Sequence, residues 1–210
     1  MDKKWIAQFR HFIEQDNAID AGHDIGHILR VVANAKWIGR REGAEMSVVI
    51  PAAWLHDCVS VPKDSPLRSR ASRMAAERAG AFLREIGYSE HWIGEIEHAI
   101  ETHSFSANIT PRTLEAKVVQ DADRLEALGA IGIARVFITG SKMGIPLLDA
   151  DEPLPKTRTP QDGISMIDHF YTKLLKLADT MRTTAGKEEA MRRSRFMERY
   201  LDQLAAEVVA

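Results

Sequence analysis

The chain has 210 residues, of which 45% are hydrophobic and 28% charged, and its formal net charge at pH 7 is −2. A chain of this size can bury a substantial core, and its 8 prolines and 13 glycines are too few for a linker-rich or low-complexity protein. The small net charge excludes an overall electrostatic attraction to nucleic acid or to an anionic membrane, so any anion site must be local.

Cysteine usage and the apolar runs bear on the cellular compartment. Cys58 is the single cysteine, which excludes an intramolecular disulfide framework. The first residues lack the continuous apolar core of a signal peptide, and the longest apolar stretch, 48–55, is far shorter than the roughly 20 residues that span a bilayer. We therefore expect a cytoplasmic protein whose partners include neither a membrane nor nucleic acid.

Apolar residues recur at spacings of three and four in nearly every long segment, whereas period-two alternation is almost absent. This pattern predicts an all-α fold. Ser47 is the expected N-cap of the third helix, in which Pro51 falls in the first turn. The helices expected in chain order lie at Trp5–Ile13, Ile28–Ile38, about Ser47–Asp57, Ser69–Ile86, Glu90–His103, Arg112 or Thr113–Phe137, Ile164–Met181 and Lys187–Val209, with a separation at Gly186.

The stretch 143–163 interrupts this helical pattern. Its four prolines exclude a regular element, and long loops without structure of their own are typical of lids, binding loops or disordered segments. Whether this loop closes over a substrate is left open. We see no internal repeat and no domain boundary, so we expect a single domain over 1–210, with a core at about 20–137 and C-terminal helices at about 164–209.

Several histidines and aspartates fall in an order that indicates chemistry. His27 lies on the second expected helix in AGHDIGHILRV, and His56 and Asp57 are adjacent at the end of the third in AAWLHDC. Asp123 lies in a later helical run, VVQDADRLEALG. A His-Asp dipeptide alone means little, because a chain of this composition gives about half of one by chance. The order of these elements along the chain is the stronger indication.

That order resembles the HD superfamily, and in particular the small bacterial single-domain HD hydrolases typified by YedJ and YpgQ. The resemblance extends over roughly 23–181 and includes the segments KDSPLRSRAS, ETHSFSA and DHFYTKLLKLADTM. It implies an HD-domain helical bundle and a metal-dependent phosphohydrolase. It also implies that His27, His56, Asp57 and Asp123 hold the metal, since the family places its last aspartate in an Ala-Asp-x-Leu context.

The chemistry of this ligand set agrees with the resemblance. Two imidazoles and two carboxylates suit Mn²⁺, Fe²⁺, Co²⁺ or Mg²⁺, with Zn²⁺ and Ni²⁺ less favoured. Four protein ligands leave positions for a water and a phosphoryl oxygen, which favours hydrolysis of a phosphoester or phosphoanhydride. Asp121 and Asp123 face roughly 200° apart on a helix, so one ion is not expected to take both. Asp121 could instead orient a histidine or cap its own helix.

In addition to Asp57, four further residues are candidates for catalysis or substrate contact. His23 is as consistent with a substrate-side acid as with a structural role at a helix start. His103 is interpreted as a phosphate or leaving-group contact. Lys63 and Arg68 precede a helix in a basic segment and are predicted to bind substrate phosphate, with a solvated basic face as the alternative.

Relatives of this kind suggest a nucleotide substrate, including cleavage of a nucleoside triphosphate to monophosphate and pyrophosphate. The alternative from another class is a non-catalytic nucleotide-binding sensor or interaction module, which would be expected to have lost a ligand. A cyclic-dinucleotide phosphodiesterase of the HD-GYP kind would need a His-His pair and a Gly-Tyr-Pro triplet, and the sequence has neither. A stringent-response hydrolase would normally bring a further region. A homodimer is left open.

Overall fold

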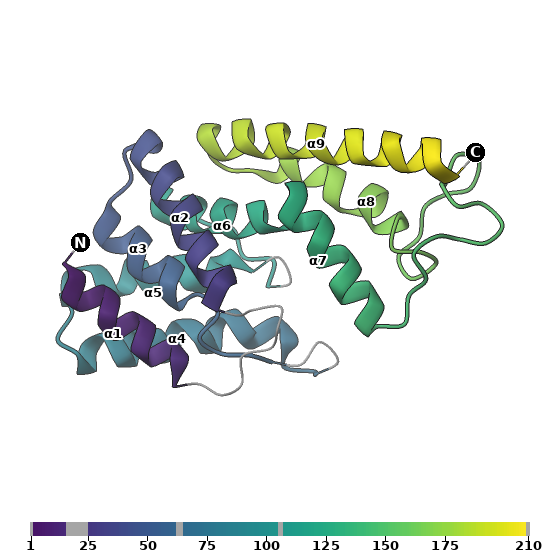
Figure 1. Ribbon diagram of the computed structural model, residues 1–210. Helices are drawn as coiled ribbons and strands as arrows, with labels where there is room; N and C mark the ends of the chain where they lie inside the picture. The colour runs from purple at the N-terminus through teal and green to yellow at the C-terminus, as the bar shows by residue number, and fades with distance from the viewer. Residues whose placement is uncertain (1, 16–24, 62–64, 105–106, 209–210) are drawn as a thin grey trace. The chain divides into compact units, whose positions relative to one another are not determined.

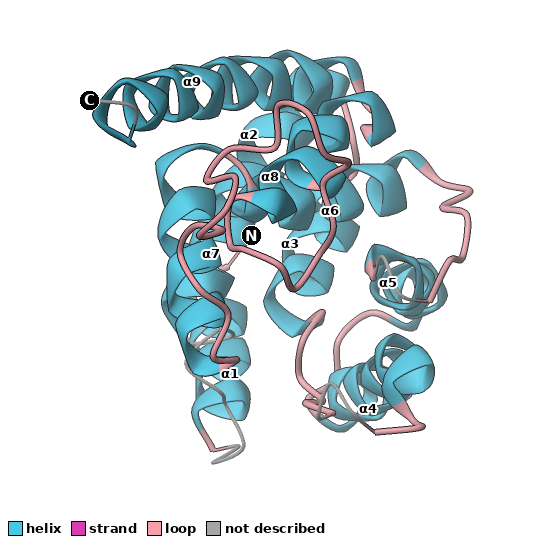
Figure 2. Ribbon diagram, turned by 90° about the vertical axis from the view of Figure 1, so that its right-hand side faces the viewer, coloured by secondary structure: helices cyan, strands magenta, loops and turns pink. Residues whose placement is uncertain are grey.

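The computed structural model describes residues 2–15, 25–61, 65–104 and 107–208 (Figure 1). Among these residues every regular element is a helix, which confirms the all-α prediction (Figure 2). They form two compact units, one of Met1–Asp123 with Arg182–Gly186 and one of Arg124–Met181 with Lys187–Ala210. The domain boundaries expected from the sequence remain a prediction.

The first unit is built around helix α3. Every residue of α3 from Val48 to Leu55 is buried, as expected for a helix that is apolar on all sides. It packs against α1, α2 and α5, and α5 also packs against α4. The helices of this unit are α1 (Lys3–Glu14), α2 (Ile25–Glu42), α3 (Met46–Leu55), the short 3-10 helix η1 (Arg68–Arg70), α4 (Ala71–Glu85), α5 (Glu90–His103) and α6 (Leu114–Arg124), whose last residue belongs to the second unit.

The start of α3 differs from the prediction. Ser47 lies inside the helix, and the N-cap is Glu45, whose side chain accepts a hydrogen bond from the Ser47 backbone N–H at 2.8 Å. Ser47 contributes its carbonyl, which accepts a hydrogen bond from the Tyr88 hydroxyl. The preceding turn at Gly43, with φ of +75°, sets the chain direction so that Glu45 has the extended backbone of a cap.

The second unit shows two breaks that the periodicity did not predict. The helix expected from residue 112 or 113 to Phe137 is divided into α6, the 3-10 turn η2 (Leu125–Ala127) and α7 (Gly129–Lys142), and Gly129 takes a φ of +71°. Glycine adopts this conformation at little cost, so the apolar spacing continues while the backbone turns. The helix expected at Ile164–Met181 is replaced by the short α8 (Asp168–Thr172) and the 3-10 segment η3 (Leu174–Thr180).

The last helix, α9 (Thr184–Val208), begins before Gly186, so this glycine is inside the first turn and does not separate two helices. Within the second unit, Phe170 of α8 lies near both Phe137 of α7 and Tyr200 of α9, with ring centroids 6.3 and 6.2 Å away. The buried residues of α9 in this unit recur at spacings of four, three and four, as one apolar face requires: Ala190, Ser194, Met197 and Leu201.

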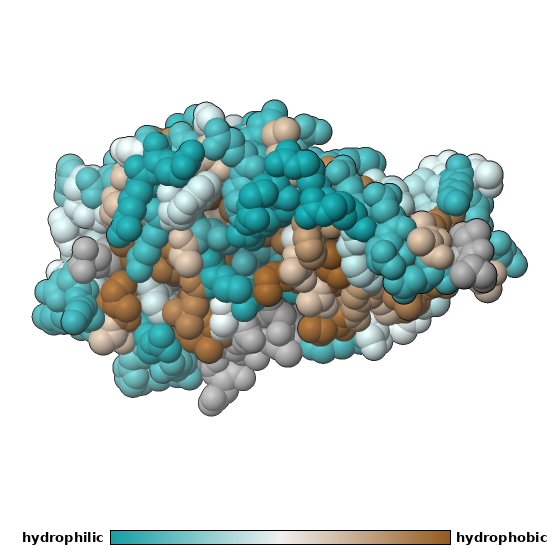
Figure 3. Space-filling view, turned by 45° about the horizontal axis from the view of Figure 1, so that its top comes forward, coloured by the Kyte–Doolittle hydropathy of each residue, from teal (hydrophilic) through white to brown (hydrophobic). Residues whose placement is uncertain are grey.

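Hydrophilic side chains predominate on the face drawn in Figure 3, with hydrophobic patches between them. Met191 and Phe196 on α9 are exposed. They are scattered single residues, which need no partner to explain them, so they do not decide between a monomer and a homodimer. None of the helices in the described ranges is long and apolar enough to cross a membrane.

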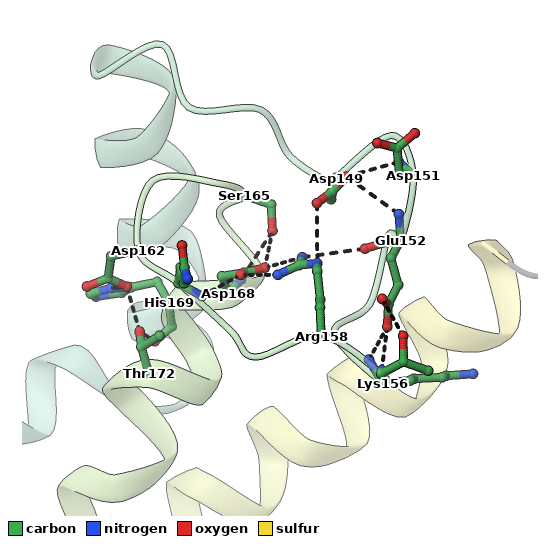
Figure 4. A network of polar contacts seen from close by, with 12 residues as sticks. Asp149, Asp151, Glu152, Lys156, Arg158, Asp162, Ser165, Asp168, His169 and Thr172 are labelled. Atoms are coloured by element: carbon green, nitrogen blue, oxygen red, sulfur yellow. Dashed lines mark hydrogen bonds and ion pairs between the residues drawn. The ribbon is translucent and has the colours of Figure 1, made fainter.

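The proline-rich stretch before α8 is held by a buried carboxylate (Figure 4). Asp168 has 0% exposure and accepts hydrogen bonds from both terminal nitrogens of Arg158, at 2.5 and 2.7 Å. It also accepts one from the Gln161 backbone N–H and one from the Ser165 hydroxyl, at 2.7 and 2.8 Å. The absence of a regular element therefore agrees with the prediction, but specific side-chain contacts order part of this loop.

This network makes stability dependent on acid pH. The Arg158 guanidinium, against the opposing effect of burial, lowers the pKa of Asp168 to about 2. Because the folded pKa lies below the ordinary value of 3.8, the stabilisation is complete above that value and is lost as the pH falls toward 2. We expect Asp168→Asn to cost roughly 1 to 2 kcal/mol near neutral pH and much less at about pH 2.

Urea unfolding of wild type and Asp168→Asn at several pH values measures this difference. Asp151→Asn is the matched control, because Asp151 is an exposed aspartate in the same loop. Its difference from wild type should be small at every pH. A cost for Asp168→Asn that does not change between neutral and acid pH would contradict the expectation.

Candidate metal centre

Three helices of the first unit end beside one another at a cluster of histidines and aspartates. His56 is the C-cap of α3 and Asp57 follows it, His103 is the last residue of α5, and Asp123 is the last residue but one of α6. His27 comes from the first turn of α2. The carbonyl end of a helix carries partial negative charge, so this arrangement of helix ends favours a cation.

The side chains of this cluster approach closely enough to share an ion. The Nε2 atom of His27 lies 3.7 Å from Asp57 Oδ2 and 3.5 Å from Asp123 Oδ1. The Nε2 atom of His56 lies 3.4 and 3.9 Å from the same two oxygens. Metal bonds of about 2.0 to 2.2 Å place neighbouring ligand atoms about 3 to 4 Å apart. The ligand atoms of His27, His56 and Asp57 lie within 4.8 Å of one another, as a single divalent cation requires, and Asp123 approaches the same two imidazole nitrogens.

His56 is held in the tautomer that a metal needs. Its Nδ1 lies 2.9 Å from the Ala53 carbonyl, which can only accept a hydrogen bond, so the ring proton belongs on Nδ1. The lone pair is then on Nε2, which is buried and has no hydrogen-bond partner among the described residues. A buried acceptor without a partner is unfavourable, and a bound cation would satisfy it.

The electrostatics of the cluster agree with this assignment. Burial lowers the pKa of His56, and the nearby carboxylates of Asp57 and Asp123 only partly oppose this. Burial raises the pKa of Asp57, but the surrounding imidazoles of His56, His103 and His27 outweigh it and hold this pKa well below its usual range. A neutral imidazole and an ionised carboxylate are the forms that bind metal.

A model of the HD domain family matches residues 24–128, which is half of the chain and includes this cluster. The protein belongs to the HD domain family. The chain is 32% identical over 192 residues to the uncharacterized protein YpgQ of Bacillus subtilis, which covers 90% of this chain and 85% of YpgQ. This finding confirms the resemblance to the YpgQ-like HD proteins.

Two solved structures extend the comparison. An HD-superfamily hydrolase from Bacillus thuringiensis is 35% identical, with a TM-score of 0.75 and coverage of 99% of this chain and 96% of that one. The structure of B. subtilis YpgQ in complex with ADP is 33% identical, with a TM-score of 0.73 and coverage of 96% and 97%. This chain therefore has the fold of the HD-superfamily hydrolases.

His103 joins the HD cluster from the other side of Asp57. Its Nε2 lies 3.4 Å from Asp57 Oδ1, and its Nδ1 lies 2.6 Å from the Ile100 carbonyl. Both ring nitrogens therefore face acceptors, which suits an imidazolium. Burial lowers the pKa of His103, but the Asp57 carboxylate outweighs this effect, so the pKa is raised.

Of the two residues predicted to bind substrate phosphate, Lys63 and Arg68, the structure describes only Arg68. Arg68 is partly buried in η1, and its Nη1 donates to the Val61 carbonyl at 2.8 Å. Among the described residues we find no contact between Arg68 and the histidine and aspartate cluster of the HD domain. His23 and Lys63, together with Asp24, lie outside the described residues.

Asp121 has a role that sequence reasoning missed. Its buried carboxylate accepts hydrogen bonds from the backbone N–H groups of Arg182 and Thr183 and from the Thr183 hydroxyl, at 2.7 to 3.0 Å. It therefore anchors the segment that leads into α9. The partners lie about 60 residues away along the chain, so no local pattern could have indicated them.

Two side-chain amides beside the HD site were also missed. Gln120 Nε2 donates to the Thr102 carbonyl at 2.7 Å, and Asn34 Nδ2 donates to the Ala122 carbonyl at 3.3 Å. Each carbonyl belongs to the residue directly before a member of the cluster. Gln120 falls on the buried stripe of α6, where a polar residue is unusual. This position was the one feature of the sequence that could have indicated a role for Gln120.

Proposed function

We propose that this HD-domain protein is a metal-dependent phosphohydrolase whose divalent cation is held by His27, His56, Asp57 and Asp123. The observation that carries the proposal is the approach of two imidazole nitrogens to two carboxylates within 3.4 to 3.9 Å. The similarity to HD-superfamily hydrolases supports it. We propose Mn²⁺, Fe²⁺, Co²⁺ or Mg²⁺ ahead of Zn²⁺ and Ni²⁺, because four nitrogen and oxygen ligands that leave positions for water and substrate suit a six-coordinate ion better than a closed tetrahedral zinc site.

When bound, the cation would acidify a water and neutralise charge on a phosphoryl oxygen. In the hydrolysis one P–O bond breaks, and water supplies a hydroxyl to phosphorus and a proton to the leaving oxygen. His103 is the described group best suited to hold that proton, because Asp57 stabilises its protonated ring. Asp57 therefore serves the reaction through both oxygens, one toward the cation site and one toward His103.

The substrate we propose is a small phosphorylated molecule, and specifically a nucleotide. The complex of the relative YpgQ with ADP supports this class. Within it, we favour cleavage of a nucleoside triphosphate to monophosphate and pyrophosphate. Arg68 is proposed to neutralise distal phosphates, since a guanidinium has five N–H donors and the Val61 carbonyl uses one. We also propose that Lys63 contacts a substrate phosphate and that His23 carries a proton during the reaction.

The test is product release from a panel of nucleoside mono-, di- and triphosphates in the presence of Mn²⁺, Co²⁺ or Mg²⁺. We expect metal-dependent release by the wild type and none by Asp57→Ala, and pyrophosphate rather than phosphate would identify the bond cut. Equal inactivity of the two proteins with every metal would contradict a nucleotide hydrolase. The metal content of the purified protein would then separate a different substrate from a sensor.

A further inference from the structure

Gln120 is a polar residue on α6, one turn before Asp123. It is buried, with 2% of the residue exposed. Its Nε2 donates to the Thr102 carbonyl at 2.7 Å. Because a carbonyl cannot donate, this contact fixes the orientation of the amide. Thr102 directly precedes His103 in the last turn of α5. Gln120 thus connects the helix of Asp123 with the helix end that bears His103.

The end of α5 needs such a partner. The last four carbonyls of a helix have no intrahelical N–H to bind, and Thr102 has 0% exposure, so water does not reach this position readily. The residue after the helix, Ser104, has an extended backbone and does not form a glycine-type cap. The amide of Gln120 therefore satisfies a buried carbonyl from outside the helix.

Two further side-chain contacts at this helix end lie within α5, and of the two carbonyls only that of Ile100 is among the last four of the helix. The Thr102 hydroxyl donates to the His98 carbonyl at 2.9 Å, and the His103 ring faces the Ile100 carbonyl. The Gln120 contact adds a tie to a different helix. It holds the Thr102–His103 peptide in place relative to α6, while the ring contact holds the imidazole relative to α5.

We propose that Gln120 is a positioning residue, which fixes the peptide before His103 and so holds the imidazole against Asp57. The inference rests on the proposed function for its effect on turnover, but not for its effect on the position of His103. Asn34 gives a parallel, because it binds the Ala122 carbonyl directly before Asp123. In both cases a side-chain amide from a neighbouring helix holds the peptide next to a site residue.

The expected effect of removing the amide is selective. In Gln120→Met the side chain keeps its length but loses its N–H donor, so the end of α5 relaxes and His103 moves away from Asp57. We expect kcat to fall about 10-fold to 100-fold, the range typical of residues that orient site groups. KM and the affinity for Mn²⁺ should stay within about twofold, since none of the four proposed ligands is displaced.

Tyr88→Phe is the matched control. It also removes a side-chain donor to a backbone carbonyl, that of Ser47 at 2.7 Å. Tyr88 lies just before the start of α5, about 20 Å of helix rise from His103. The two variants therefore lose the same kind of bond at opposite ends of one helix. If Gln120→Met does not fold, Gln120→Asn, whose amide is one methylene too short, replaces it.

The first readout is the nitrogen and proton NMR signals of the His103 ring in metal-free protein. We expect these signals to shift in Gln120→Met and to be unchanged in Tyr88→Phe. In the same way, kcat should fall in Gln120→Met and stay at the wild-type value in Tyr88→Phe. Wild-type His103 signals and wild-type kcat in Gln120→Met would overturn the inference. If the wild type hydrolyses no nucleotide, the proposed function fails, and the ring signals still decide whether Gln120 positions His103.

Discussion

Asp57→Asn is expected to lower metal-dependent hydrolysis at least about 1000-fold and to remove most of the bound metal. Asp57 faces three imidazoles, with one oxygen 3.7 and 3.4 Å from His27 and His56 and the other 3.4 Å from His103. Asparagine keeps the shape but removes the negative charge, so both the cation and the protonated ring lose their partner. A loss of several kcal/mol of transition-state stabilisation corresponds to this factor.

Steady-state turnover and the metal content of the purified protein measure this effect. Asp162→Asn provides a control, because Asp162 also accepts from a histidine, His169, but in the second unit and in an exposed position. That variant should keep full activity and full metal content. Retention of more than about a tenth of the wild-type activity by Asp57→Asn would show that Asp57 is not essential.

Asp121→Asn is expected to have the largest effect on stability, roughly 3 kcal/mol. Its carboxylate accepts hydrogen bonds from Arg182 and Thr183, and such bonds to a charged group contribute about 1.5 to 3 kcal/mol each. Asparagine offers only one accepting atom and turns N–H groups toward donors. Urea unfolding gives the free-energy difference from wild type.

The neighbouring Asp123→Asn is the contrasting variant. Asp123 is partly exposed and faces the His27 and His56 rings, so its neutralisation should cost much less stability than Asp121→Asn while metal binding is lost. Gly186→Ala should resemble Asp121→Asn, because its Cβ would fall 2.5 Å from the Asp121 carboxylate. A stable Asp121→Asn that has lost its metal would mean that Asp121 is the metal ligand and Asp123 the structural residue.

The helical fold could be predicted because it follows from local spacing. Burial of one apolar face imposes the three and four periodicity, and this alone located most helices to within a few residues. The cap of α3 and the break at Gly129 could not be located in this way. They depend on which donor or acceptor lies nearby after folding, and glycine keeps the apolar spacing while it changes the direction of the chain.

In the candidate site, too, some residues could be predicted from the sequence and others could not. The order of His27, the His56-Asp57 pair and Asp123 follows from a family pattern, and the structure brings these residues together. Gln120 and Asp121 could not be assigned, because each binds a backbone group that only the tertiary structure brings near.

Residues 120–123 of α6 each attach to a different part of the first unit. Gln120 binds the end of α5, Asp121 binds the segment before α9, Ala122 accepts from α2, and Asp123 faces the cluster. Successive residues point about 100° apart, so inserting or deleting one residue earlier in α6 would turn all four attachments away at once. The length of α6 before residue 120 is therefore constrained by all four attachments together.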